Sequence, residues 1–319
     1  MFKSIQLLMV LALISCQTKP LGSISASDSA PGSASASATE DRPDNLNSES
    51  LTQPSSDTTG VPLWTSRLGQ AAEQPENQPA GQASEDHSAW INSWEPRDSK
   101  SWGLDNLEIL SSVDGPFETV LRVYYPAGSA SPSVSRKTES PLGGAQFYAD
   151  LFLPAQTALS LTYYVRFAEG FDFVKGGKLP GLFGGVGASG GSIPNGEDGF
   201  SVRLMWRRDG QGEVYAYLPT SETYGTSIER GAWRFQPGIW YKLRQDIRLN
   251  TPDRADGEIQ LWVNDTLVIE QTDLIFRTVD SLQIDGIFFS TFFGGGDVSW
   301  ATPQDTSIDF ANFSVTAVD

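Results

Sequence analysis

Five residues that lie close together in the sequence carry side chains suited to anion binding and proton transfer. An arginine can hold a carboxylate with two parallel hydrogen bonds, and a lysine adds positive charge beside it. A tyrosine hydroxyl can give or take a proton. The serine is a hydrogen-bonding helper rather than a nucleophile, because no base accompanies it. These five residues are Lys178, Ser201, Arg203, Tyr215 and Tyr217.

Such a set is sufficient to remove the proton at C5 of a uronic acid and to expel the oxygen at C4. The transition state places extra negative charge on the carboxylate, which Arg203 and Lys178 would neutralise. Tyrosine is a weak base at its free pKa of about 10, but neighbouring cations favour the phenolate. We therefore expect Tyr215 or Tyr217 to serve as base and acid, with Lys178 able to share the proton transfer. This chemistry needs no cofactor and no metal.

Four of the five candidates lie in two predicted strands, residues 199–207 and 213–218, in which apolar residues alternate with them. Asp209-Gly210 between the strands indicates a hairpin. Only a connection with an odd number of residues, or a bulge, keeps the two polar faces on the same side of the sheet. We predict such a register, with Arg203 opposite Tyr217 and Met205 opposite Tyr215. The alternative for this face is a plain solvated sheet surface.

Two glycine-rich segments accompany this hairpin. Residues 175–182 are predicted to be a loop, in which the glycines allow the backbone and Lys178 to approach a ligand closely. Residues 187–199 follow no strand–helix pattern and are therefore not a phosphate-binding loop. We predict that they form a mobile flap near the cleft.

The chain from residue 89 onward consists of short apolar segments separated by glycine and proline. Residues 129–141 are predicted to be a polar loop, and no window has the period of a long helix. The pattern favours an all-β domain, a β-jelly roll or two-sheet antiparallel sandwich. The other predicted strands are residues 118–125, 144–153, 159–167, 241–249, 257–263, 266–270, 286–293 and 307–315.

Acidic residues outnumber basic residues by 39 to 22, which gives a net charge of −17. Such a surface repels nucleic acid and anionic membranes, so neither is an expected partner. An anionic polysaccharide would bind only where lysine and arginine gather in one pocket. One cysteine, Cys16, and one histidine, His87, exclude an intramolecular disulfide and a Cys/His metal site. Asp285 and Asp297 are weak candidates for a structural cation.

The N-terminus has the pattern of a bacterial lipoprotein signal. Lys3 precedes an apolar run, residues 5–14, that is too short to span a bilayer. Leu13-Ile14-Ser15-Cys16 resembles a lipobox, which implies cleavage before Cys16 and lipidation of its thiol. We expect residues 1–15 to be the signal and the protein to be anchored in the cell envelope, at the outer membrane where two membranes exist. The alternative is secretion through an ordinary signal peptide.

Residues 16–88 are small, polar and acidic, and are predicted to be a disordered tether that contacts the membrane only through the lipid. Pro62-Leu63-Trp64 is the one apolar interruption. Residues 89–319 are predicted to be the folded domain, which we expect to be a monomer.

Taken together, the motifs resemble polysaccharide lyase family 14. They are Gly-Gly-Lys178-Leu-Pro-Gly-Leu, then Phe-Ser201-Val-Arg203-Leu-Met-Trp-Arg, then Tyr215-Ala-Tyr217. The similarity covers about residues 105–319 and includes Ser290-Thr-Phe-Phe-Gly-Gly295. The resemblance implies a β-jelly roll that cleaves alginate or glucuronan by β-elimination. It also implies that the family's functional lysine, serine, arginine and two tyrosines are Lys178, Ser201, Arg203, Tyr215 and Tyr217.

Two other classes remain open from the residues alone. One is a non-catalytic, lectin-like carbohydrate-binding domain on the same fold, and the other is a structural surface lipoprotein. Formation of an unsaturated product would separate an enzyme from both.

Overall fold

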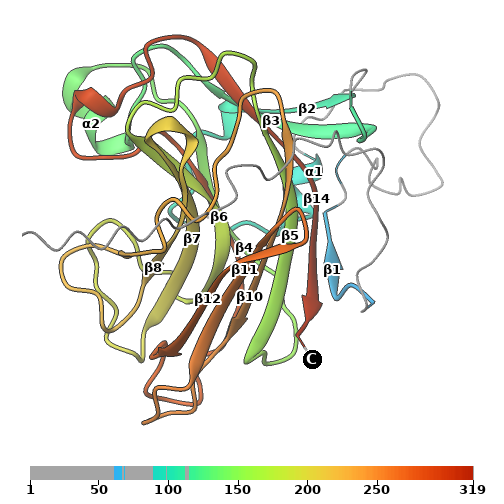
Figure 1. Ribbon diagram of the computed structural model, residues 1–319, viewed down its shortest axis with the longest axis vertical. Coiled ribbons are helices and arrows are strands. Elements are labelled where there is room, and N and C mark those ends of the chain that lie inside the picture. Colours follow the sequence, from blue (N-terminus) through green and yellow to red (C-terminus); the bar gives the residue numbers. More distant parts are fainter. Residues whose placement is uncertain (1–60, 67, 69–88, 98, 112–114, 319) are drawn as a thin grey trace, which may run out of the picture. The chain divides into compact units, whose positions relative to one another are not determined.

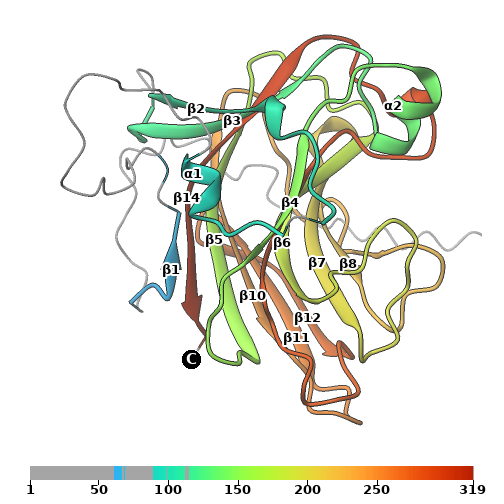
Figure 2. The same ribbon diagram turned by 180° about the vertical axis from the view of Figure 1, so that it is seen from behind.

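The computed structural model describes residues 61–66, 68, 89–97, 99–111 and 115–318. Within these residues, the strands form two antiparallel sheets, of eight and six strands, which pack as two curved layers (Figure 1; Figure 2). The predicted all-β sandwich is therefore confirmed. The predicted signal, Cys16 and His87 lie outside the described residues. Among the residues that are described, no helix is long and apolar enough to cross a membrane.

The eight-stranded sheet has the order β12-β11-β10-β5-β14-β3-β2, with β1 paired to β14. Most of these strands coincide with predicted ones, and β11 matches its prediction at both ends. Their bounds are β1 Trp64–Thr65, β2 Leu107–Ser111, β3 Thr119–Tyr125, β5 Ala158–Phe167, β10 Trp240–Arg248, β11 Gly257–Val263, β12 Thr266–Leu274 and β14 Thr306–Ala317.

The six-stranded sheet has the order β4-β13-β6-β7-β8-β9 and carries all five candidate residues. Its bounds are β4 Ala145–Asp150, β6 Gly176–Gly185, β7 Gly199–Arg207, β8 Gly212–Tyr217, β9 Thr226–Ile228 and β13 Gly286–Thr291.

Strand β6 corrects the prediction of a loop at residues 175–182, because it lies inside the sheet between β13 and β7. Proline has no N–H to give to a sheet, and the ladder shifts register between Leu179 and Gly181, around Pro180. Two side chains of the opposite sheet satisfy the backbone there. The Tyr163 hydroxyl donates to the Pro180 carbonyl at 3.0 Å, and Gln245 Oε1 accepts from the Leu182 N–H at 3.0 Å.

The helices are short. In the predicted loop 129–141, the structure has the helix α2, Pro132–Thr138, so that prediction is wrong in its middle part. Proline at the first helical position suits a helix start, and Glu139 in the left-handed region (φ 55°) ends it. Seven residues are too few to show a helical period. The others are α1 Ala89–Asn92 and three 3-10 turns, η1 Leu104–Asn106, η2 Arg208–Gly210 and η3 Val298–Trp300.

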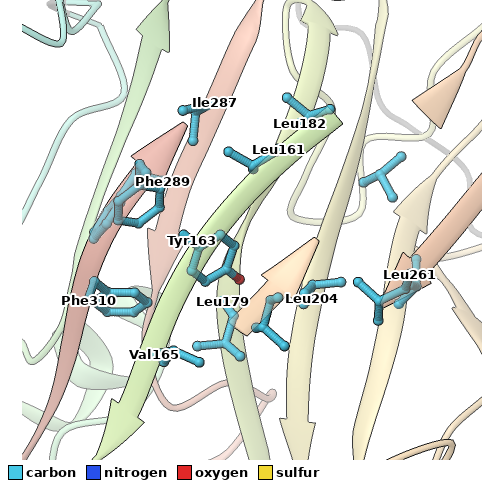
Figure 3. Packing of buried hydrophobic residues seen from close by; sticks show 14 of the residues in the cluster. Leu161, Tyr163, Val165, Leu179, Leu182, Leu204, Leu261, Ile287, Phe289 and Phe310 are labelled. Carbon is cyan, nitrogen blue, oxygen red and sulfur yellow. The ribbon is translucent and has the colours of Figure 1, made fainter. Parts of the chain in front are cut away.

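The core lies between the two sheets. Alternate residues of β5 point into it, and Leu161, Tyr163 and Val165 are almost completely buried. They meet Leu179 and Leu204 from the six-stranded sheet (Figure 3). This packing explains why alternating apolar residues predicted the strands: each inward face loses its contact with water.

Strand β1 lies within the predicted tether. Trp64 and Thr65 pair with Val315 and Ser314 of β14. The Trp64 ring contacts the buried Trp94 edge to face, with centroids 4.9 Å apart. Residues 61–66 therefore contribute to the sandwich.

Candidate functional site

Lys178 extends from β6 on the face of the six-stranded sheet that points away from the core. It lies opposite Met205 of β7, and its Nζ is 2.7 Å from the Met205 sulfur. The same atom lies 3.5 Å from the centre of the Tyr215 ring. Burial lowers the pKa of Lys178 well below its usual range, and the positive charges of Arg203 and Arg207 lower it further. The ring below the amine favours its charged form, but burial and two arginines outweigh that contact.

Arg203 lies two residues before Met205 in β7, on the same face of the sheet and opposite Gly181. A Cβ at Gly181 would come within 2.8 Å of the Arg203 Cα, so only glycine permits this approach of β6 to β7. The guanidinium donates to Ser290 Oγ at 3.1 Å and lies 4.5 Å from the centre of the Phe288 ring. Its Nε has no hydrogen-bond partner, and within the described part of the chain no carboxylate is paired with it. A buried, unpaired guanidinium is suited to an incoming anion.

Ser201 and Tyr217 are buried and bonded to the segment 186–198 that joins β6 to β7. Ser201 Oγ donates to the Ala188 carbonyl at 2.6 Å, and the Tyr217 hydroxyl accepts from the Gly191 N–H at 3.0 Å. The predicted flap therefore lies on the site, and its mobility stays a prediction. Ser201 has a structural hydrogen bond and no base in contact with it among the described side chains.

Tyr215 lies directly opposite Arg203 and is the more exposed of the two tyrosines. Burial raises the pKa of Tyr215 to about 12, and the neighbouring Tyr217 acts in the same direction. Arg203 and Arg207 lower it, but by less. The expectation that adjacent cations would favour a phenolate is therefore wrong for Tyr215, because desolvation outweighs them.

The structure brings all five predicted residues to one face of one sheet. The polar faces of the two strands lie on the same side of the sheet, as predicted, but the register differs by two residues. Arg203 lies opposite Tyr215, and Met205 lies opposite Glu213. The reason is a tight 3-10 turn at Arg208–Gly210, in which Asp209 adopts φ 57°.

Sequence reasoning did not place three residues beside Arg203, namely Tyr148 of β4 and Phe288 and Ser290 of β13. Tyr148 of β4 stacks on Phe288 with centroids 4.0 Å apart, and its hydroxyl donates to the Gly187 carbonyl at 2.9 Å. Ser290 donates to Gln146 Oε1 at 3.1 Å and so links Arg203 to β4. Alternation within β4 and β13 was the available signal, since Gln146, Tyr148, Phe288 and Ser290 all fall on the outward face.

The two aspartates considered for a cation have structural partners. Asp285 accepts from the Gly185 N–H at 2.6 Å, and Asp297 accepts from the Ser299 N–H at the start of η3. No group of three or more His, Cys, Asp and Glu residues that could hold a metal occurs in the described residues.

Chemically, this face offers a guanidinium for a carboxylate, an amine that is readily neutral and a phenol that stays protonated. A neutral amine can accept a proton and a protonated phenol can give one. The arrangement is therefore suited to removing a proton next to a carboxylate while protonating a leaving oxygen.

Comparison with known proteins supports this description. A model of the family described as polysaccharide lyase 14 matches residues 114–313. Curated protein sequences returned no match. Among solved structures, the marine PL-14 alginate lyase from Aplysia kurodai is 30% identical with a TM-score of 0.68, over 81% of this chain and 100% of that one.

Two further structures are similar. Alginate lyase Aly36B is 25% identical with a TM-score of 0.58, over 72% of this chain and 89% of that one. Alginate lyase vAL-1 from Chlorella virus, at 24% identity, a TM-score of 0.57 and coverage of 66% and 89%, shows the shared fold. With a family match that spans well over half of its length, this chain belongs to polysaccharide lyase family 14 and is a polysaccharide lyase.

Proposed function

We propose that this lyase cleaves a uronic-acid polysaccharide, alginate or glucuronan, by β-elimination on the outward face of the six-stranded sheet. The observation that carries the proposal is Arg203, a buried guanidinium with an unpaired Nε and no carboxylate partner in the described residues. In a molecule with a net charge of −17, such a group is well suited to hold the carboxylate of the reacting sugar.

The lowered pKa of Lys178 and the raised pKa of Tyr215 support a division of the proton transfers between them. Lys178 as a neutral amine takes the C5 proton. The electron pair of that C–H bond forms the C4–C5 double bond as the C4–O bond breaks, and Tyr215 gives its proton to the leaving oxygen. Arg203 stabilises the negative charge that develops on the carboxylate. This assignment replaces the expected tyrosine base.

Tyr217 and Ser201 hold the site in shape rather than transfer protons. Both are bonded to the segment 186–198, and the Tyr217 hydroxyl already accepts the Gly191 N–H. We assign the acid to Tyr215 because it is the more exposed and lies directly below the Lys178 amine.

Relatives support the substrate class. A variant of Aly36B with one lysine and one methionine replaced by alanine was solved in complex with an alginate trisaccharide; Aly36B in that structure is 26% identical to this chain, with a TM-score of 0.57. The test is to incubate the protein with alginate, glucuronan and a neutral glucan and to follow the ultraviolet absorbance of the unsaturated product. We expect product from a polyuronate and none from the glucan. Binding of polyuronates without new absorbance would contradict the proposed reaction.

We also propose that Cys16 anchors the protein in a bacterial cell envelope. The lipobox-like sequence before this single cysteine supports the proposal. Cys16→Ser is expected to move the protein from the membrane fraction to the soluble fraction. An unchanged membrane fraction would rule out the anchor.

A further inference from the structure

A second group of cations lies beside the proposed site, around the buried Glu213 of β8. Its carboxylate accepts from Arg207 Nε at 2.8 Å, Arg230 Nε at 2.6 Å and Ser227 Oγ at 3.1 Å. Glu213 is completely buried, whereas the Arg230 side chain is 51% exposed. One carboxylate therefore fixes two guanidinium groups, and one of them faces solvent.

This group borders the reacting residues. Glu213 lies opposite Met205, whose sulfur contacts Lys178. The Arg207 guanidinium is 5.8 Å from the centre of the Tyr215 ring. Arg230 Nη2 donates to Ser227, which pairs with Tyr215 across β8 and β9. Arg230 thus lies on the β9 side of Tyr215, across from Arg203, whereas Arg207 lies at the end of β7, the strand that also carries Arg203.

The charges in this group do not balance. Two guanidinium groups share one carboxylate, so a positive charge remains. The bonds to Glu213 and Ser227 use Nε and one terminal nitrogen of each arginine, and the other terminal nitrogen has no acceptor within the described residues. Arg97 at the opposite edge of the sheet differs, since it is paired one to one with Asp150 and its third nitrogen donates to the Gly185 carbonyl.

We propose that Arg207 and Arg230 form a second carboxylate subsite, which holds the sugar unit next to the one that reacts. This subsite rests on the proposed function, because a polyuronate carries one carboxylate on every unit. Arg203 pairs with Tyr215, and Tyr215 pairs with Ser227. Ser227 therefore lies two strand spacings from Arg203, which corresponds to about 10 Å. A polymer that crosses the strands would therefore place one carboxylate at Arg203 and another at Arg230.

The test is Arg230→Gln, which removes the exposed charge and leaves Arg207 bonded to Glu213. We expect KM for alginate or glucuronan to rise about fivefold while kcat stays within about twofold, because an exposed charge contributes to binding and not to the reaction. Arg230→Lys should recover part of the affinity. The matched control is Arg136→Gln, which removes an exposed arginine from α2 and should leave KM unchanged.

A second measurement uses a polyuronate whose carboxylates are partly reduced to alcohols. The KM difference between the wild-type protein and Arg230→Gln should shrink on that substrate, because fewer units can use the subsite. A wild-type protein that cleaves no polyuronate would overturn the proposed function itself. An active wild-type protein whose KM is the same in Arg230→Gln, or changes equally in Arg136→Gln, would overturn the subsite alone.

Discussion

Each of the two sheets carries a lysine and an arginine on the face that points away from the shared core. The partners of these two pairs of side chains differ between the sheets. On the eight-stranded sheet, Lys242 pairs with Asp265 at 2.8 Å, and Arg122 holds Asp309 with two bonds of 2.7 and 3.0 Å. On the six-stranded sheet, Lys178 contacts a sulfur and a ring, and Arg203 contacts a hydroxyl and a ring.

Burial alone does not explain the difference, since Lys178 and Lys242 are 9% and 8% exposed. A buried cation that is paired with a carboxylate has its charge neutralised inside the protein. A buried cation that lacks such a partner loses hydration without compensation, and the fold must tolerate that loss. Buried basic groups without a carboxylate partner are typical of functional sites, where stability is lower than it could be.

The largest expected effect is that of Lys178→Met compared with Lys242→Met. Removing the proposed base should lower kcat/KM on the order of 10³-fold, while the free energy of unfolding stays the same or rises because an unpaired buried amine is gone. Lys242→Met should leave kcat/KM unchanged and alter stability by less than about 1 kcal/mol, because Asp265 is largely exposed. Initial rates and thermal unfolding of both variants measure this. Equal rate losses in the two variants would mean that the two lysines are not functionally distinct.

The next effect is that of Arg203→Ala compared with Arg122→Ala. Without the Arg203 guanidinium the developing charge on the carboxylate is not stabilised, and we expect kcat/KM to fall on the order of 10²-fold with the fold intact. Arg122→Ala should instead lower the free energy of unfolding by about 1–3 kcal/mol, because Asp309 is buried and loses two bonds. Rates and denaturant unfolding together test the pair. Full activity in Arg203→Ala would remove its proposed role.

Much of the fold follows from local patterns. In β5 and β11, apolar residues alternate along the strand and point into the core, and the predicted bounds are close to the observed ones. The face shared by Ser201, Arg203 and the two tyrosines follows from the same alternation. Its period is a property of the strand itself, so neighbours in sequence are enough to find it.

The parts that could not be predicted depend on distant residues. A segment rich in glycine and proline is typical of a loop, yet β6 is a central strand because Tyr163 and Gln245 of the other sheet satisfy its backbone at Pro180. The register of the β7–β8 hairpin depended on the left-handed Asp209. The raised pKa of Tyr215 could not be predicted, because desolvation is set by the surrounding fold and not by the residue type.

A third test is the pH dependence of the wild-type reaction. In the protein without substrate, the Lys178 amine can act as base only when it has lost its proton. The value of kcat/KM should therefore fall about tenfold per pH unit below the pKa of Lys178 and level off above it. The pH at which kcat/KM levels off should lie well below the usual pKa range of a lysine, because burial and two arginines lower the pKa of Lys178. Tyr215, with a pKa of about 12, should remain a protonated acid through the neutral and moderately alkaline range. Lys242→Met should keep the same profile, and a limb that moves in that variant would contradict the assignment to Lys178.

The smallest effect expected is that of Ser290→Ala compared with Ser160→Ala. Ser290 bridges Arg203 and Gln146, so its removal takes away the hydrogen bond that holds the guanidinium and leaves its contact with the Phe288 ring. A hydrogen bond that only positions a charge contributes about 1 kcal/mol, so kcat/KM should fall about fivefold, with the same pH profile as the wild-type protein. Ser160 is bonded to Asp246 on the other sheet and should affect stability only. If Ser290→Ala were as active as the wild type, Arg203 would be held in place by ring contacts rather than by the bridge to β4.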